Sequence, residues 1–278
     1  MNNPNQANQP SPEWLHEQIK NLGPWHHDIQ LTDEVSTGRV FSDDGILDRP
    51  ENDGVSLISP RELFRKKVLQ IYPDGLADKR FLDCACNAGV YCFLAREMDA
   101  AHSVGFDVRD HWIKQAKFAQ QHRTVTATDR IDFSVLDVYD LGKQGLQRFD
   151  LTLFSGIFYH LPDPIHGLKL AADLTSDVII VNTASLDDDD NPKGLTMHRR
   201  RPQNLDKNVM SGVYEIAWFP NGPQAIAEIL CWLGFTEMKL VRRVKKEGVR
   251  GRFEIVAART KDRLANVEGE YLTLREDM

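Results

Sequence analysis

Residues 81 to 92 read Phe-Leu-Asp-Cys-Ala-Cys-Asn-Ala-Gly-Val-Tyr-Cys and carry the strongest structural signal in the chain. An apolar run ends at Asp83, small residues follow as far as Gly89, and a helical pattern begins at once. This order predicts a strand, a tight turn and a helix N-terminus. Such a turn lets a ligand lie against bare backbone at the positive end of a helix dipole.

A second landmark follows about one βα unit later. The segment Val-Gly-Phe-Asp at 104–107 predicts a short strand that ends in the carboxylate of Asp107. A carboxylate at this point accepts hydrogen bonds from a ribose diol in doubly wound folds. The pair of landmarks therefore indicates a site for a nucleoside-type cofactor.

Composition limits the class of protein. The chain has 278 residues, 41% of them hydrophobic, and a net charge of −7, which fits one α/β domain with additions. The negative charge disfavours general nucleic-acid binding by the whole molecule, although local basic patches remain compatible with it. No apolar run approaches the roughly 20 residues that span a bilayer. Residues 1–12 lack an apolar core, so we expect a disordered tail and no signal peptide there.

The four cysteines predict neither disulfides nor a metal site. Cys84, Cys86 and Cys92 crowd the first strand and its helix, and Cys231 stands alone. No Cys-x-x-Cys pair or matching histidine spacing is present. We expect four buried thiols in a reducing cytoplasm.

The element order predicts the fold. Strands are expected at 80–84, 103–107, 131–136, 149–154 and 178–183, and helices at 13–22, 59–72, 89–98, 110–122 and 164–174. This alternation is typical of a parallel sheet with helices on both faces. A helix at 223–233 and two strands at 236–243 and 252–259 then add an antiparallel edge hairpin. We predict a doubly wound, mostly parallel seven-stranded sheet.

Domain boundaries follow from composition. Residues 13–58 are expected to be an N-terminal extension that covers the substrate, and 59–260 the cofactor-binding domain. Residues 186–220 fit no simple element and are expected to be an inserted substrate region, because insertions at the carboxyl edge of such sheets contact substrates. Residues 261–278 are expected to be a C-terminal tail.

Over about residues 60–260 the pattern resembles the class I S-adenosylmethionine-dependent methyltransferases. The second half is most similar to the branch that contains the tRNA wobble-uridine carboxymethyltransferases. The matching residues are the run 154–160 with Pro164, Asn182 with Thr183, Tyr214, the run Trp218-Phe219-Pro220-Asn221, and Leu233-Gly234-Phe235.

The chain departs from the family at the glycine loop. The family reads Asp-x-Gly-x-Gly-x-Gly, whereas this chain has Asp83, Ala85, Asn87 and Gly89. Alanine is small and asparagine tolerates positive φ, so the turn can keep its shape. The wobble-uridine enzymes hold an extra carboxylate on their cofactor with basic residues upstream of the loop, and these are not identified in residues 59–70. Arg252 matches one of the family's basic positions late in the chain. We predict plain S-adenosyl-L-methionine as the cofactor.

The resemblance implies a role for several residues on the cofactor side. Asp83, with Ala85, Asn87 and Gly89, would lie near the methionine moiety, and Asp107 would bind the ribose hydroxyls. Asp137 and the backbone of Val138 would face adenine, and Ser155 would lie under the sulfonium. The alternative for each acid is an ordinary capping, surface or turn carboxylate.

A second set of residues is expected on the acceptor side. Tyr159 would orient the substrate, and His160 or His27 could act as a base, although His160 and His27 could equally be structural. Substrate contacts are expected from Trp25, Arg199, Tyr214 and Arg252. The basic residues 199–201 and 242–252 are either solvated charges or a site for an anionic substrate, phosphate-bearing or RNA. The acidic run 187–190 is a solvated loop or, less favoured, a cation site.

The leading functional prediction is a cytoplasmic methyltransferase that acts on a small or medium metabolite, with O-methylation of a sugar or natural-product intermediate favoured. One alternative is a tRNA-modifying methyl- or carboxymethyltransferase. Another is a protein that binds S-adenosylmethionine without turnover. The expected partner is thus a small-molecule substrate or tRNA and no membrane, and the oligomeric state is left open.

Overall fold

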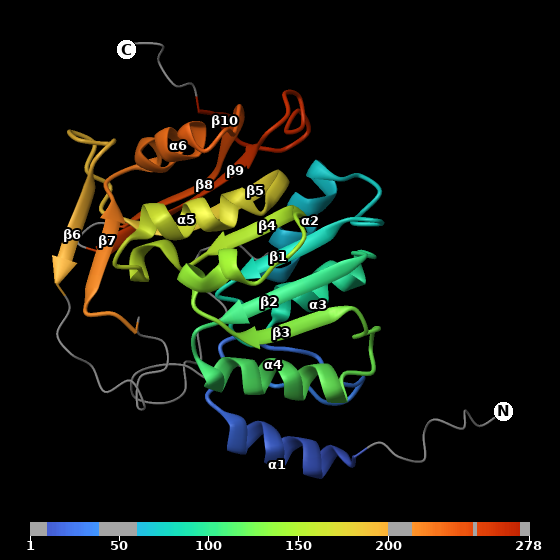
Figure 1. The fold of residues 1–278 in the computed structure, drawn as a ribbon. Coiled ribbons are helices and arrows are strands. Elements are labelled where there is room, and N and C mark those ends of the chain that lie inside the picture. Colours follow the sequence, from blue (N-terminus) through green and yellow to red (C-terminus); the bar gives the residue numbers. More distant parts are fainter. Residues whose placement is uncertain (1–9, 39–59, 200–212, 247–248, 273–278) are drawn as a thin grey trace.

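The computed structural model describes residues 10–38, 60–199, 213–246 and 249–272. Its main sheet has eight strands in the order β10-β8-β9-β5-β4-β1-β2-β3 (Figure 1). Their bounds are β1 (Arg80–Cys84), β2 (His102–Asp107), β3 (Ile131–Val135), β4 (Phe149–Ser155), β5 (Thr175–Ser185), β8 (Glu237–Lys246), β9 (Val249–Ala258) and β10 (Glu270–Tyr271). The predicted doubly wound fold is confirmed, and the strand count is eight instead of seven.

The direction of the strands follows the prediction. β3, β2, β1, β4 and β5 pair in parallel, and the β8–β9 hairpin joins β5 in antiparallel register. The eighth strand, β10, has two residues that pair with Lys239 and Leu240 of β8. Such a short segment carries no alternation that a sequence pattern could reveal.

Helices cover both faces of the sheet, as Figure 1 shows. The face that contains Phe81, Leu151 and Ile180 packs against α2 (Pro60–Ile71), α3 (Val90–Glu97) and α4 (Asp110–His122), and α1 (Pro12–Leu22) packs against α4. The opposite face, with Leu82 and Phe154, packs against α5 (Pro164–Asp173) and α6 (Pro223–Trp232). Alternate residues of each strand thus pack into two separate hydrophobic cores, which explains the continuous apolar runs in β4 and β5.

Local signals set the helix ends. The Asp163 side chain accepts a hydrogen bond from the His166 amide at 3.1 Å and Pro164 opens α5, so an N-cap and a first-turn proline act together. α3 begins at Val90, one residue later than predicted, because its N-cap Gly89 has a left-handed φ of 79°.

The segment after β5 forms a small sheet of its own. β6 (Leu195–Arg199) pairs with β7 (Ile216–Pro220) in antiparallel register. The prediction that 186–220 fits no simple element was therefore wrong in part. A local pattern does not reveal this pairing, because the two short strands are separated in sequence by a stretch that contains 200–212, which lies outside the described residues. Figure 1 places this pair beyond the end toward which the parallel strands point.

The N-terminal segment is attached to α4. Gln115 donates to the carbonyls of Leu22 and Pro24 at 2.7 and 2.8 Å, and the Thr124 amide donates to Leu31 O at 2.7 Å. Residues 39–58 of the predicted extension lie outside the described residues. No helix in the described part of the chain has the length and apolar character needed to cross a membrane.

Candidate active site

The loop after β1 takes a regular backbone shape. Ala85, Asn87 and Gly89 have φ angles of 58°, 54° and 79°, so the three positions that match the family's glycines are all left-handed. The Cys86 amide donates to Phe106 O at 2.8 Å, which ties the loop to β2. The loop therefore has the turn expected of a glycine-rich cofactor loop although only one glycine remains.

Gly89 has a steric reason to be glycine as well as a conformational one. A Cβ atom there would lie 2.4 and 2.5 Å from ring carbons of Phe133. Phe133 is itself packed against Phe93, with ring centroids 5.6 Å apart. The surviving glycine thus lets the helix start lie directly on an aromatic ring of β3.

Asp107 ends β2 beside this loop. Its two carboxylate oxygens accept hydrogen bonds from the amides of Asn87 at 3.1 Å and Arg109 at 3.0 Å. Burial raises the pKa of Asp107 to about 6, although these amide bonds oppose the shift. Each oxygen keeps a further lone pair, so the group can still accept hydrogen bonds from a diol.

Asp83 lies deeper, at the end of β1. Its side chain is buried, and its Oδ2 atom has no hydrogen-bond partner among the described residues. Burial raises the pKa of Asp83 well above its usual range, and the negative charge of Asp107 adds to this shift. A buried carboxyl group with an unsatisfied oxygen lowers the stability of the fold unless a hydrogen-bond donor satisfies it. A donor group of a ligand, or a water molecule that bridges to the ligand, would supply this hydrogen bond.

Asp137 connects the cofactor side to the inserted region. It caps the short helix η2 (Val138–Lys143) by accepting from the Tyr139 amide at 3.0 Å, and its second oxygen accepts from the Tyr214 hydroxyl. Burial raises the pKa of Tyr214, and the hydrogen bond to Asp137 adds to the shift. The structure thus brings together a predicted adenine-side acid and a predicted substrate-side tyrosine, with the Val138 side chain buried beside them.

A polar chain starts where β4 ends. Ser155 is followed by Gly156, whose amide donates to Asn182 O at 2.9 Å, and by Tyr159 in η3 (Phe158–His160). Arg252 donates to the Tyr159 hydroxyl at 3.1 Å and to Asn182 Oδ1 at 2.8 Å.

The same chain continues toward α2. Asn182 also donates to Glu254 at 3.3 Å, and Glu254 forms an ion pair with Lys67. The sequence did not predict that Lys67 and Glu254 join this polar chain, because their contact depends on the register of β9 and on the packing of α2.

Aromatic rings form a layer next to this chain. Tyr159 stacks on Phe219 of β7 with centroids 5.8 Å apart and an interplanar angle of 16°. The His160 ring lies 4.2 Å from that of Tyr159. Arg199 is exposed at the end of β6.

The N-terminal candidates divide into two environments. The His27 ring lies 5.7 Å from Tyr91 in an edge-on arrangement. Trp25 lies in the core instead, where its Nε1 donates to Ile19 O at 2.8 Å, so its side chain offers no surface to a substrate. Tyr91, in the first turn of α3, was missed by sequence reasoning. Burial raises its pKa, and the negative charges of Asp83 and Glu254 add to this shift.

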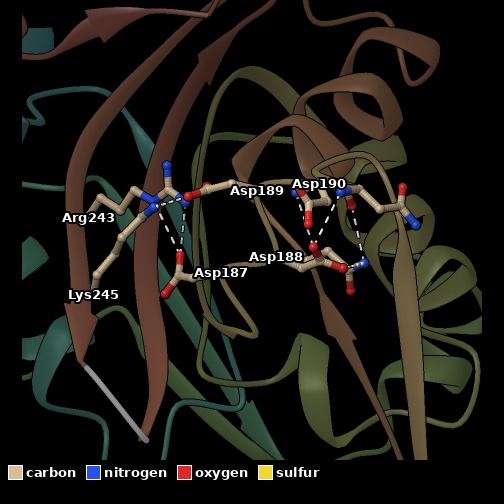
Figure 2. A network of polar contacts seen from close by, with 8 residues as sticks. Asp187, Asp188, Asp189, Asp190, Arg243 and Lys245 are labelled. Carbon is tan, nitrogen blue, oxygen red and sulfur yellow. Dashed lines mark hydrogen bonds and ion pairs between the residues drawn. The ribbon is translucent and has the colours of Figure 1, made fainter.

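The acidic run pairs with the basic hairpin, as Figure 2 shows. Arg243 donates to Asp187 at 3.1 Å and 3.2 Å and to Asp189 at 3.1 Å, and Lys245 donates to Asp189 at 2.6 Å. Asp188 turns the other way and accepts from the Asn191 amide and the Asn221 side chain, both at 3.3 Å. Among the described residues no group of three or more His, Cys, Asp or Glu could hold a metal ion.

The cysteines agree with the prediction in three of four positions. Cys84, Cys86 and Cys92 are buried thiols, whereas Cys231 is exposed near the end of α6. Cys231 precedes Trp232, which is 67% exposed, so this end of α6 is not covered by the described part of the chain.

Comparison with known families identifies the chain's relatives. The family described as Methyltransferase domain matches residues 76–222, which contain the loop, the three acids Asp83, Asp107 and Asp137, and the Tyr159 segment. The chain belongs to this family. The class predicted from the sequence is thereby confirmed.

Curated relatives match at modest identity. A tRNA U34 carboxymethyltransferase of Campylobacter fetus subsp. fetus (strain 82-40) is 30% identical over 166 residues, which cover 56% of this chain and 57% of that protein. One of Helicobacter pylori (strain Shi470) is 30% identical over 115 residues, covering 39% and 43%. The chain thus spans about half the length of the curated relatives that it matches.

Solved structures share the fold more completely. The N-terminal domain of EvdMO1, crystallised with S-adenosylhomocysteine (SAH) and D-fucose, superposes with a TM-score of 0.68 and covers 90% of this chain and 97% of that domain at 17% identity. The same domain with SAH alone gives 0.69 at 18% identity, covering 90% and 98%. At this identity the likeness establishes the fold.

Proposed function

We propose that this protein is an S-adenosyl-L-methionine-dependent methyltransferase that methylates a hydroxyl group of a small metabolite, a sugar or a natural-product intermediate. The observation that carries the proposal is the left-handed loop at residues 85–89 with a buried carboxyl group on each side, Asp83 and Asp107. Family membership supports the same cofactor. Free cysteines are consistent with a reducing compartment such as the cytoplasm.

The residues present fit this cofactor. Asp83 has a buried oxygen without a hydrogen-bond partner among the described residues, which a donor of the cofactor's methionine moiety, directly or through water, would satisfy, and Asp107 has lone pairs for two ribose hydroxyls. Asp137 and the Val138 backbone would face adenine. When bound, the sulfonium supplies an already activated methyl group, so the protein mainly has to align the acceptor with it, which is worth up to roughly 7–11 kcal/mol.

The acceptor side supports a hydroxyl substrate. The Tyr159 hydroxyl is fixed by Arg252, and Arg252 is fixed in turn by Asn182, so a polar acceptor meets groups that are already oriented. His27 and His160 lie beside Tyr91 and Tyr159 and are the candidates for accepting the hydroxyl proton, a role worth about 10²–10⁴-fold in rate. The fucose-containing crystals of the EvdMO1 domain support a sugar acceptor.

A tRNA-modifying methyl- or carboxymethyltransferase is the second candidate. It is favoured by the names of the curated relatives and by the match of Arg252 to a basic position of that branch. Two of the hairpin cations, Arg243 and Lys245, are engaged by Asp187 and Asp189, which leaves fewer charges for phosphates. Tight, salt-sensitive binding of tRNA would favour this candidate, since each neutralised phosphate steepens the salt dependence.

The decisive experiment starts from the purified protein. Mass spectrometry of any co-purified nucleoside distinguishes S-adenosylmethionine from its carboxylated relative. Calorimetry with SAH then measures affinity in the wild type and in Asp107→Ala, with Asp110→Ala, an exposed acid three residues on, as the control. Binding that survives Asp107→Ala would refute the cofactor site. Cofactor binding without methyl transfer to any sugar or extract would favour the third candidate, a non-catalytic binding protein.

A further inference from the structure

The β8–β9 hairpin carries its basic residues on two faces that differ in how their charges are compensated. Side chains of a strand alternate between faces, and the register sets Arg243 opposite Phe253 and Arg242 opposite Glu254. Arg243 therefore points to one face, together with Gly251 of β9. Arg242 points to the other, together with Arg250 and Arg252.

The first face is neutralised. Arg243 pairs with Asp187, whose side chain is 11% exposed, and both Arg243 and Lys245 pair with Asp189 (Figure 2). A Cβ atom on Gly251 would lie 1.5 Å from Asp187 Oδ2, so the carboxylate rests directly on the β9 backbone. The acidic run is thus a counter-charge for the hairpin.

The second face also carries Glu254, which pairs with Lys67, and its three arginines keep their positive charge. Within the described residues no carboxylate lies within 4.0 Å of the guanidinium groups of Arg242, Arg250 or Arg252. The contacts of Arg250 and Arg252 are neutral: Arg250 lies over the Phe219 ring at 4.0 Å, and Arg252 donates to Asn182 and Tyr159. We call these three residues the open arginine face.

The open arginine face adjoins the acceptor side of the proposed active site. Arg252 holds Tyr159, Tyr159 stacks on Phe219, and Arg250 lies over the same Phe219 ring. The charges of Arg242 and Arg252 both act on Tyr91, which follows the cofactor loop. Arginines held by stacking and by neutral acceptors are oriented before a ligand arrives, which reduces the entropy lost when the ligand binds.

We propose that the acceptor carries an anionic group, a carboxylate or a phosphate monoester, and that Arg250 and Arg252 bind this group with Arg242 as a third charge. The proposal rests on the proposed function, because it assigns the acceptor of that same site. The planar guanidinium fork matches both anions in bidentate geometry. The two neutralised cations on the opposite face make the same hairpin a poor match for a long phosphodiester backbone, so a small anionic metabolite is the fitting substrate.

The test measures how a negative charge on the probe changes its affinity. Calorimetry on the SAH-saturated protein compares D-glucuronate and D-glucose 6-phosphate with neutral D-glucose. We expect at least one charged sugar to bind with an affinity at least about tenfold higher than that of glucose. This ratio corresponds to the contribution of one charge-assisted hydrogen bond to binding. Arg250→Gln and Arg252→Gln should each remove this preference. Lys245→Gln, which deletes the same charge from the neutralised face, should retain it.

Several outcomes would overturn the proposal. They are equal affinity for charged and neutral sugars, no binding of either charged sugar, or an equal loss in Lys245→Gln. The same holds if Arg250→Gln weakens binding of carboxy-S-adenosylmethionine or of a short RNA instead of the charged sugar. Arg250 is exposed, and its contact within the described part of the chain is with the Phe219 ring, so its variant reports on binding even if Arg252→Gln fails to fold. Failure of the proposed function would appear separately, as absence of SAH binding by the wild type.

Discussion

Replacing Gly89 by alanine should damage the cofactor loop for two physical reasons that can be separated. Gly89 has a φ of 79°, and an L-residue in the left-handed region costs about 1–2 kcal/mol. Its new Cβ would also lie 2.4 Å from Phe133, which cannot retreat freely because Phe93 and Gly105 lie against the same ring. Overpacking of this kind costs about 1–3 kcal/mol.

The matched control is Gly145→Ala. Gly145 has a similar φ of 63°, but nothing lies within 4 Å of a Cβ built there. The two variants therefore share the conformational cost and differ only in the steric one. We expect Gly89→Ala to lose about 1–3 kcal/mol more of its free energy of unfolding than Gly145→Ala.

Two measurements test the reasoning. Urea-induced unfolding gives the free energies of the wild type and both variants, and calorimetry gives their affinities for SAH. Displacement of Phe133 should shift the loop that bonds to Asp107, so only Gly89→Ala should also weaken SAH binding. Equal stability losses in the two variants would show that Phe133 yields without cost, and the steric part of the reasoning would be refuted.

Three further predictions concern the same region. Ala85→Gly should raise the free energy of unfolding by up to about 1 kcal/mol, because it relieves a left-handed alanine; no gain in urea unfolding would count against that backbone strain. Affinity for SAH should fall by about tenfold per pH unit as the pH drops below about 6, the pKa of Asp107, because ribose hydroxyls bind the ionised form. Asp107→Asn should bind weakly and lose this step near pH 6 in calorimetry, and a wild-type affinity that does not change across pH 6 contradicts the assignment. Gly251→Ala should destabilise the wild type more than the Asp187→Ala protein, because the added Cβ would meet both Asp187 Oδ2 at 1.5 Å and Val244 O at 2.9 Å in the first and, of these two, only Val244 O in the second; additive losses in the double-mutant cycle would contradict the Asp187 contact.

Much of the fold was predictable because its signals are local. Buried parallel strands read as short apolar runs, and their helices carry N-cap and proline signals such as Asp163 with Pro164. What escaped prediction depends on contacts distant in sequence. β10 pairs with β8 through only two residues, and β6 and β7 meet across a long separation.

The candidate site was predictable to the same extent. Asp83 and Asp107 could be found because a strand end and a following helix fix where such acids lie. Tyr91 and Glu254 could not, since their relevance arises only when α3 and β9 converge. The charges of residues 187–190 and of Arg243 are each visible in the sequence, but pairing them requires the strand register.

The degenerate loop shows which glycines a cofactor turn needs. Ala85 and Asn87 adopt left-handed angles without glycine, at an energetic cost of order 1–2 kcal/mol for alanine and less for asparagine, whose side chain accepts from the Ala88 amide at 2.7 Å. Gly89 and Gly105 both lack room for a Cβ, since one would meet the Phe133 ring at 2.4 and 2.9 Å respectively. Conformation alone thus tolerates substitution where the side chain has space. The glycine that remains in the motif is the one against which another side chain packs, so steric contact with Phe133 explains why position 89 keeps its glycine while positions 85 and 87 do not.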